Sequence, residues 1–233
     1  MRTSDKGILA LLTHEGIVPG PYFDSQKVLT YGVGHTKAAG YPDPANMPGG
    51  MPGNLDAELM RIFQVFRKDL EKYEAEVRKA IKVDVTQAQF DAAVSFHINT
   101  GGIGRAQWVK LLNKGDVIGA GAAIMNWKRP DEIIPRRRAE QKLFRSGVYP
   151  TTRIVVWNVS RDRLVIWEPV KHLGPQQALG LLRGPFAHDD AQGAPAGGIS
   201  PVAAILAAVT AAIAGITAKW AEITAWLSQI FGG

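Results

Sequence analysis

The segment from residue 55 to residue 81 constrains the fold most, because its apolar residues recur at helical spacing along its whole length. Such a stripe predicts one long amphipathic helix with one face buried and the other in solvent. Asn54, a residue type that caps helices, opens the segment. The stripe consists of Leu55, Leu59, Ile62, Phe63, Phe66, Leu70, Tyr73 and Val77.

Helical patterns continue after this segment. Asp84 or Thr86 can cap a second helix, which Gly101 and Gly102 end. Shorter helical patterns follow up to about residue 147. These segments predict a domain that is mostly helical.

The N-terminal part adds a small sheet. A short first helix is expected to end near Glu15 and Gly16, followed by YFD, a polar turn and VLTYGVG, which predict a small β-hairpin or meander. Residues 37–54 are rich in Pro, Gly and Met and predict a loop with little regular structure. Residues 1–148 are therefore expected to form one α+β domain.

The pattern changes after Pro150. TRIVVWNV and RLVIWEPV flank SRDR and predict a β-hairpin, and LGPQQALGLL then has a helical pattern. We expect a hairpin extension over residues 149–185, a polar, Gly- and Ala-rich linker over 186–200, and a hydrophobic tail helix over 201–231.

The predicted tail helix has two interpretations. Its apolar residues alternate steps of four and three with small residues between them, which is typical of a coiled-coil seam and would favour self-association. Residues 191–218 also lack any charge, which would suit contact with a membrane. Alanine is only weakly apolar, so the sequence leaves both interpretations open.

Charge and residue usage narrow the classes of partner. The formal net charge of +6 comes from dispersed basic residues and favours an anionic partner, but no nucleic-acid-binding module is recognised, so nucleic acid is not expected. Without cysteine there is no disulfide framework. The five histidines are scattered without an HExxH pairing, so we expect neither a metal ion nor another cofactor.

Residues 13–36 hold the candidate chemistry. Glu15 is placed at the end of a helix, where the negative end of the helix dipole disfavours a carboxylate. Asp24 follows nine residues later and Thr30 six after that. Two carboxylates across one cleft are the minimum apparatus for cleaving a glycosidic bond. A solvated glutamate, a turn-capping aspartate and a structural threonine would explain the same residues.

Three blocks of residues, in this order along the chain, resemble the bacteriophage lysozyme family (glycoside hydrolase family 24, endolysin muramidases). They cover about residues 1–147. The first block consists of Glu15-Gly16, Tyr22, Asp24 and Thr30-Tyr31-Gly32-Val33-Gly34-His35-Thr36. The second consists of Gln87, Phe90-Asp91-Ala92, Ser95-Phe96, Asn99 and Gly101, and the third of Trp127, Arg136-Arg137-Arg138-Ala139-Glu140 and Leu143-Phe144.

The resemblance implies a lysozyme-like fold and hydrolysis of the β-1,4 bond between N-acetylmuramic acid and N-acetylglucosamine in peptidoglycan glycan strands. It implies that Glu15 is the general acid. Asp24 and Thr30 would hold or activate the attacking water, or Asp24 would be the nucleophile. Substrate-binding or supporting positions are implied at His35, Asn99, Arg136 and Arg137, and one arginine of residues 136–138 would pair with Glu15.

One residue departs from the family's pattern. Lys27 stands where the family usually has glycine, three residues after Asp24, which leaves the conformation of this turn open. Two other functions remain as alternatives. A lytic transglycosylase would need Glu15 alone, and a protein that binds the cell wall, or has a structural role on a lysozyme fold, would need no catalytic residue.

The N-terminal residues lack the pattern of a signal peptide. We therefore expect a protein made in the host cytoplasm that acts on periplasmic peptidoglycan after release. The tail helix at residues 201–231 could then associate with the membrane.

Overall fold

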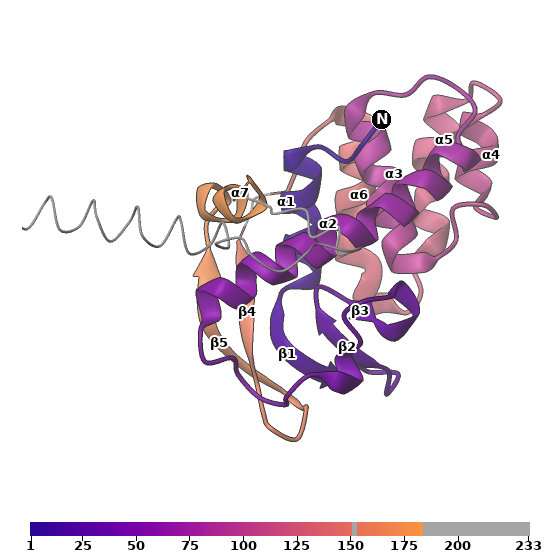
Figure 1. The fold of residues 1–233 in the computed structure, drawn as a ribbon. Coiled ribbons are helices and arrows are strands. Elements are labelled where there is room, and N and C mark those ends of the chain that lie inside the picture. Colours follow the sequence, from indigo (N-terminus) through magenta and orange to yellow (C-terminus); the bar gives the residue numbers. More distant parts are fainter. Residues whose placement is uncertain (151–152, 184–233) are drawn as a thin grey trace, which may run out of the picture. The chain divides into compact units, whose positions relative to one another are not determined.

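A computed structural model of the chain describes residues 1–150 and 153–183. The helices of this part are α1 (Asp5–Glu15), α2 (Leu55–Ala80), α3 (Gln87–Thr100), α4 (Gln107–Leu112), α5 (Val117–Ala123), α6 (Ile134–Ser146) and α7 (Pro175–Arg183). The strands are β1 (Val18–Phe23), β2 (Leu29–Gly32), β3 (His35–Thr36), β4 (Ile154–Val159) and β5 (Val165–Leu173). The predicted α+β class is therefore confirmed (Figure 1).

The two longest predicted helices are confirmed together with their caps. The side chain of Asn54 accepts a hydrogen bond from the backbone of Ala57 at 3.0 Å, which starts α2. Thr86 and Gln89 form a reciprocal capping box at the start of α3. Gly101, at φ 58°, ends α3 in the left-handed conformation that glycine adopts without strain.

The loop at residues 37–54 has more structure than its composition predicts. It contains the short 3₁₀ helices η1 (Lys37–Ala39) and η2 (Pro44–Asn46). The side chain of Asp43 accepts a hydrogen bond from the backbone of Ala45 at 3.0 Å and so caps η2. Pro44 fixes the first residue of that turn. Local capping gives this part of the loop its regular structure.

Two small antiparallel sheets meet at the start of β1. One has the order β1-β2-β3 and the other is the hairpin β4-β5. The backbone of Ile17 joins them, because its N–H donates to the Val155 carbonyl at 2.9 Å and its carbonyl accepts from Trp157 at 2.8 Å. At the other end of β1, the Phe23 N–H donates to the Arg163 carbonyl at 2.9 Å. The hairpin thus borders β1 at both ends.

The C-terminal extension shares the core of the preceding residues. Its fully buried side chains belong to the same apolar cluster as those of α1, α2 and α3, and α7 packs beside α1 and α2 (Figure 1). These side chains are Ile154, Val156, Leu173, Ala178 and Leu182. The described residues all belong to one compact unit. The division at residues 148 and 149 remains a prediction.

Residues 186–231, with the predicted linker and tail helix, lie outside the described residues. Within residues 1–150 and 153–183, no helix combines the length and apolar character needed to cross a membrane.

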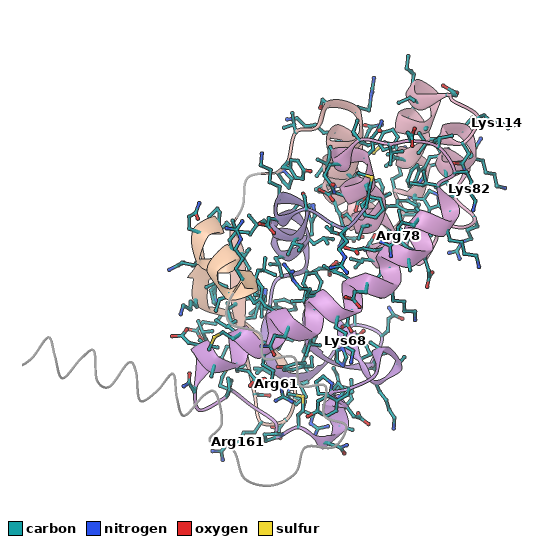
Figure 2. The ribbon with its side chains drawn as sticks, turned by 45° about the horizontal axis from the view of Figure 1, so that its top comes forward. Arg61, Lys68, Arg78, Lys82, Lys114 and Arg161 are labelled. Atoms are coloured by element: carbon teal, nitrogen blue, oxygen red, sulfur yellow. The ribbon has the colours of Figure 1, made fainter. Side chains whose placement is uncertain are left out.

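Basic side chains are dispersed over the surface, as the sequence predicts. Figure 2 shows Arg61, Lys68 and Arg78 along α2, with Lys82 just beyond its end. Acidic residues alternate with them along the same helix. The surface of α2 is therefore mixed in charge.

Candidate active site

Glu15 is the last residue of α1, and Gly16 ends that helix. Gly16 has φ 67°, and its N–H donates to the Leu12 carbonyl at 3.0 Å. The side chain of Glu15 reaches Arg136 of α6, whose Nη1 donates to Oε1 at 2.6 Å. The C-terminal end of α1 carries partial negative charge, which disfavours a carboxylate. The positive guanidinium of Arg136 offsets this effect. Of the three candidate arginines, Arg136 is the one that pairs with Glu15.

Arg136 is itself held by buried partners. Its Nε donates to Oε1 of Glu140 at 3.1 Å, and its Nη2 donates to the Ser95 carbonyl at 3.2 Å. The Ser95 hydroxyl donates to the same Glu140 oxygen at 2.7 Å. Burial acts to lower the pKa of Arg136, but the carboxylates of Glu15 and Glu140 outweigh it and raise the pKa above its ordinary value. Arg136 therefore stays charged beside Glu15.

Arg137 and Asn99 form the adjoining part of the wall. Arg137 is fully buried, pairs with Glu140, and donates from Nη2 to Oδ1 of Asn99 at 2.5 Å. Its guanidinium lies 4.9 Å from the centre of the Phe96 ring. Arg137 is thus a buried part of this network, whereas Arg138 is exposed. Arg137 holds the amide of Asn99 at the edge of the cleft.

Asp24 opens the turn between β1 and β2. Its Oδ1 accepts hydrogen bonds from the backbone of Gln26 and of Val28, both at 2.8 Å, which fixes the carboxylate. Lys27 completes the turn at φ 62°, in the left-handed region. The turn therefore has the conformation that glycine favours although lysine occupies the position.

Glu15 and Asp24 line one cleft. This cavity of about 740 Å³ lies among the turn of Asp24, the loop after β3, one side of α2, and Asn99. A second hollow of about 800 Å³ shares Ser25 and Asn99 with it. The cleft therefore extends past the turn that carries Asp24. Of the predicted site residues, Glu15, Asp24 and Asn99 are brought together on its wall.

Thr30 lies behind this wall. Its hydroxyl donates to the Val28 carbonyl at 3.0 Å, and its side chain is buried. Tyr22, which pairs with Thr30 across the sheet, is close to both carboxylates. Burial, followed by the charges of Glu15 and Asp24, raises the pKa of Tyr22. The structure thus places a neutral phenol near both carboxylates, a feature that the alternation of β1 could have indicated.

His35 is buried next to the cleft rather than on its wall. Its Nδ1 lies 2.7 Å from Oδ2 of Asp69 on α2, and its Nε2 lies 2.8 Å from the Pro42 carbonyl. The imidazole therefore ties β3 and the following loop to α2. Burial raises the pKa of Asp69, although its contact with His35 acts in the opposite direction.

His14 precedes Glu15 and was not among the predicted site residues. Burial, and then the positive charge of Arg136, lower the pKa of His14 from 6.5 to about 4. The imidazole is therefore neutral near pH 7, and adds no second positive charge beside Arg136.

Comparisons with known proteins agree with this geometry. Residues 12–140 match the Phage lysozyme family. The endolysin of Salmonella phage P22 is 32% identical over 152 residues, which cover 63% of this chain and 99% of the relative. The endolysin of Acyrthosiphon pisum secondary endosymbiont phage 1 is 30% identical, with coverage of 63% and 100%.

Solved structures show the same likeness. The endolysin from Escherichia coli O157:H7 phage FAHEc1 superposes with a TM-score of 0.55 at 31% identity, covering 64% of this chain and 97% of that one. A mutant of P22 lysozyme gives a TM-score of 0.52 at 29% identity, covering 63% and 99%. The family match spans more than half of the sequence and includes both Glu15 and Asp24. The chain belongs to the phage lysozyme family.

Proposed function

We propose that this protein is an endolysin, a peptidoglycan hydrolase that cleaves the β-1,4 bond between N-acetylmuramic acid and N-acetylglucosamine. One observation carries the proposal. Glu15 and Asp24 line the same cleft, and Glu15 is held there by Arg136 at 2.6 Å. A pair of carboxyl groups across a cleft is what acid-catalysed cleavage of a glycosidic bond requires.

In this proposal Glu15 gives its proton to the glycosidic oxygen as the bond to the sugar carbon breaks. The carboxylate that results is stabilised by Arg136, which is already in place and needs no reorganisation. Asp24, oriented by two backbone amides, faces the positive charge that develops on the sugar. It then activates the attacking water or forms the bond to the sugar itself. If Asp24 activates the water, Asp24 takes the water's proton and Glu15 regains its own from solvent. If Asp24 forms the bond to the sugar, Glu15 takes the proton from the water that then releases the sugar, and in both routes the hydroxyl ends on one product.

The remaining predicted residues have supporting roles in this mechanism. Thr30 is buried behind the wall, where its hydroxyl donates to the Val28 carbonyl and so supports the turn that carries Asp24. Asn99 offers its amide nitrogen to the substrate while its oxygen is held by Arg137. His35 fixes the loop that forms one side of the cleft.

The partner in this proposal is the glycan strand of peptidoglycan, with no role for nucleic acid, metal ion or cofactor. We further propose that the protein is made in the host cytoplasm and acts in the periplasm after release. The apolar pattern of residues 201–231 supports either membrane contact or self-association of the tail, and those residues lie outside the described part of the chain.

The products of digestion test this function. Purified peptidoglycan should be cut by the wild type into fragments with reducing N-acetylmuramic acid ends, which mass spectrometry identifies. Fragments with 1,6-anhydro ends would show a lytic transglycosylase instead. An intact wall, with a known lysozyme active on the same preparation, would favour a non-catalytic wall-binding role.

A further inference from the structure

The hairpin β4-β5 carries an exposed pair of tryptophans. The ring centres of Trp157 and Trp167 lie 5.3 Å apart at an interplanar angle of 78°. Trp167 is 74% exposed, whereas Trp157 beneath it is half-buried. Large aromatic side chains this exposed are uncommon and mark surfaces that bind something. The hairpin also lies beyond residues 12–140, the part that matches the family.

One tryptophan of the pair, Trp157, lies next to Gly16, the residue that follows Glu15. Ile17 and Val156 face each other where the sheets join, and both are fully buried in the core. Trp157 follows Val156 at an irregularity in the pairing of β4 with β5, and its side chain is half-buried rather than part of the core. A Cβ built on Gly16 would lie only 2.8 Å from Nε1 of Trp157, so the indole packs directly against the residue after Glu15.

The candidate active site adjoins the face of β1 and β2 that carries Tyr22 and Thr30. Tyr31 points toward α2, where its hydroxyl donates to Glu58. Thr30, the preceding residue, therefore points to the opposite face, and Tyr22 pairs with it there. Burial, followed by the charges of Glu15 and Asp24, raises the pKa of Tyr22, so its phenol lies near both carboxylates. The tryptophan pair thus lies beside Gly16, the residue that follows Glu15 of the cleft wall.

We propose that Trp157 and Trp167 form an additional binding site for the glycan strand, outside the cleft and next to Glu15. The site rests on the proposed function, since its ligand is another part of the same polymer. An exposed indole presents a flat apolar surface, which can cover the C–H face of a pyranose ring while the sugar hydroxyls stay in water. The hairpin would hold a long strand that already occupies the cleft.

Two residues beside Trp167 disfavour other partners at this site, namely an anionic membrane and a second copy of the chain. Glu168 directly follows Trp167 and is exposed, so its negative charge disfavours an anionic lipid surface at this position. Pro169 lacks an N–H and interrupts the edge of β5, which disfavours pairing of this strand with the same strand of a second copy.

Kinetics of the full-length chain on two substrates test the site. With insoluble peptidoglycan, Trp167→Ala should raise KM about three- to tenfold, the loss expected for one aromatic contact, with kcat unchanged. With a soluble substrate of two sugars, which fills only the positions on either side of the bond cleaved at Glu15, it should match the wild type. Trp167→Phe should largely restore the KM for the polymer. Ile118→Ala is a matched control, because Ile118 is 80% exposed on α5.

Each other outcome has a definite meaning. A Trp167→Ala variant with the wild-type KM for peptidoglycan would overturn the site. So would a loss of binding to phosphatidylglycerol vesicles, or a loss of a dimer in sedimentation, with the KM for peptidoglycan unchanged. A wild type that degrades neither substrate would instead show that the proposed function is wrong, and the glycan site with it.

Discussion

Nη1 of Arg136 lies 2.6 Å from Oε1 of Glu15, so the last long helix of the lysozyme-like part is tied to the last residue of the first helix. The two residues are 121 positions apart in sequence. The same arginine contacts Glu140 and Ser95, which places the proposed general acid within a network of buried, charged hydrogen bonds. This network explains how a carboxylate is kept where the helix dipole disfavours it.

Removal of the guanidinium should therefore affect both stability and activity. Arg136→Met leaves Glu140 buried without one of its two arginines, and we expect the free energy of unfolding to fall by about 3–5 kcal/mol. Turnover of peptidoglycan should fall about a hundredfold in the fraction that remains folded, since a charge that stabilises the reacting carboxylate is lost. Urea denaturation and initial rates measure the two effects. Arg138→Met, on an exposed position of the same helix, should change neither.

The turn of Lys27 gives a prediction in the stabilising direction. Lysine at φ 62° is in a conformation that costs a residue with a side chain about 1 kcal/mol, so Lys27→Gly should stabilise the protein by up to that amount. The carboxylate of Asp24 keeps its backbone partners, and activity should stay the same. Thermal unfolding and hydrolysis rates measure both.

Arg163 provides the matched comparison for Lys27. It has φ 63° in the β4-β5 turn, but its side chain also donates to the carbonyls of Ala45 and Met47 at 3.3 and 3.2 Å. Arg163→Gly loses those bonds and should not stabilise. If Lys27→Gly destabilised as much as Arg163→Gly, backbone strain would not be the deciding effect in these turns.

His14 predicts a specific dependence of stability on pH. Its pKa is lowered from 6.5 to about 4 in the folded state, so the unfolded chain binds more protons between these values. The free energy of unfolding should therefore fall as the pH drops from about 6.5 toward 4. Because the side chain is only partly buried, we expect a contribution of about 1–2 kcal/mol.

The variant His14→Gln isolates this contribution. Urea denaturation at pH 7 and at pH 4.5 should show a smaller loss of stability for the variant than for the wild type. Equal losses in the two proteins would assign the acid sensitivity to other groups.

Local signals in the sequence were sufficient for much of the fold. The apolar stripe of α2 is long enough to predict a helix rather than a strand. The hydroxyl of Thr86 caps the start of α3, and Gly101 adopts the left-handed conformation that ends it. Contacts between distant residues carry no such signal. The choice of Arg136 over its neighbours depends on the rotation of α6 about its axis, which places Arg137 in the core and Arg138 in solvent.

In the C-terminal hairpin, too, the strands could be predicted from local sequence but their contacts with distant residues could not. Alternating apolar residues predict β4 and β5, but no local pattern indicates that Ile17 would pair with Val156. That pairing brings Trp157 against Gly16, so the surroundings of Glu15 include a residue that lies far from residues 13–36 in the sequence.

The rate at which the protein lyses Gram-negative cells with a permeabilised outer membrane tests the central claim most directly. Glu15→Gln should reduce the fall in turbidity at least a hundredfold, because the side chain keeps its size but has no proton to donate. Asp84→Asn, which removes an exposed carboxylate outside the cleft, should lyse cells like the wild type. Lysis by Glu15→Gln at the wild-type rate would contradict the assignment of Glu15 as the general acid.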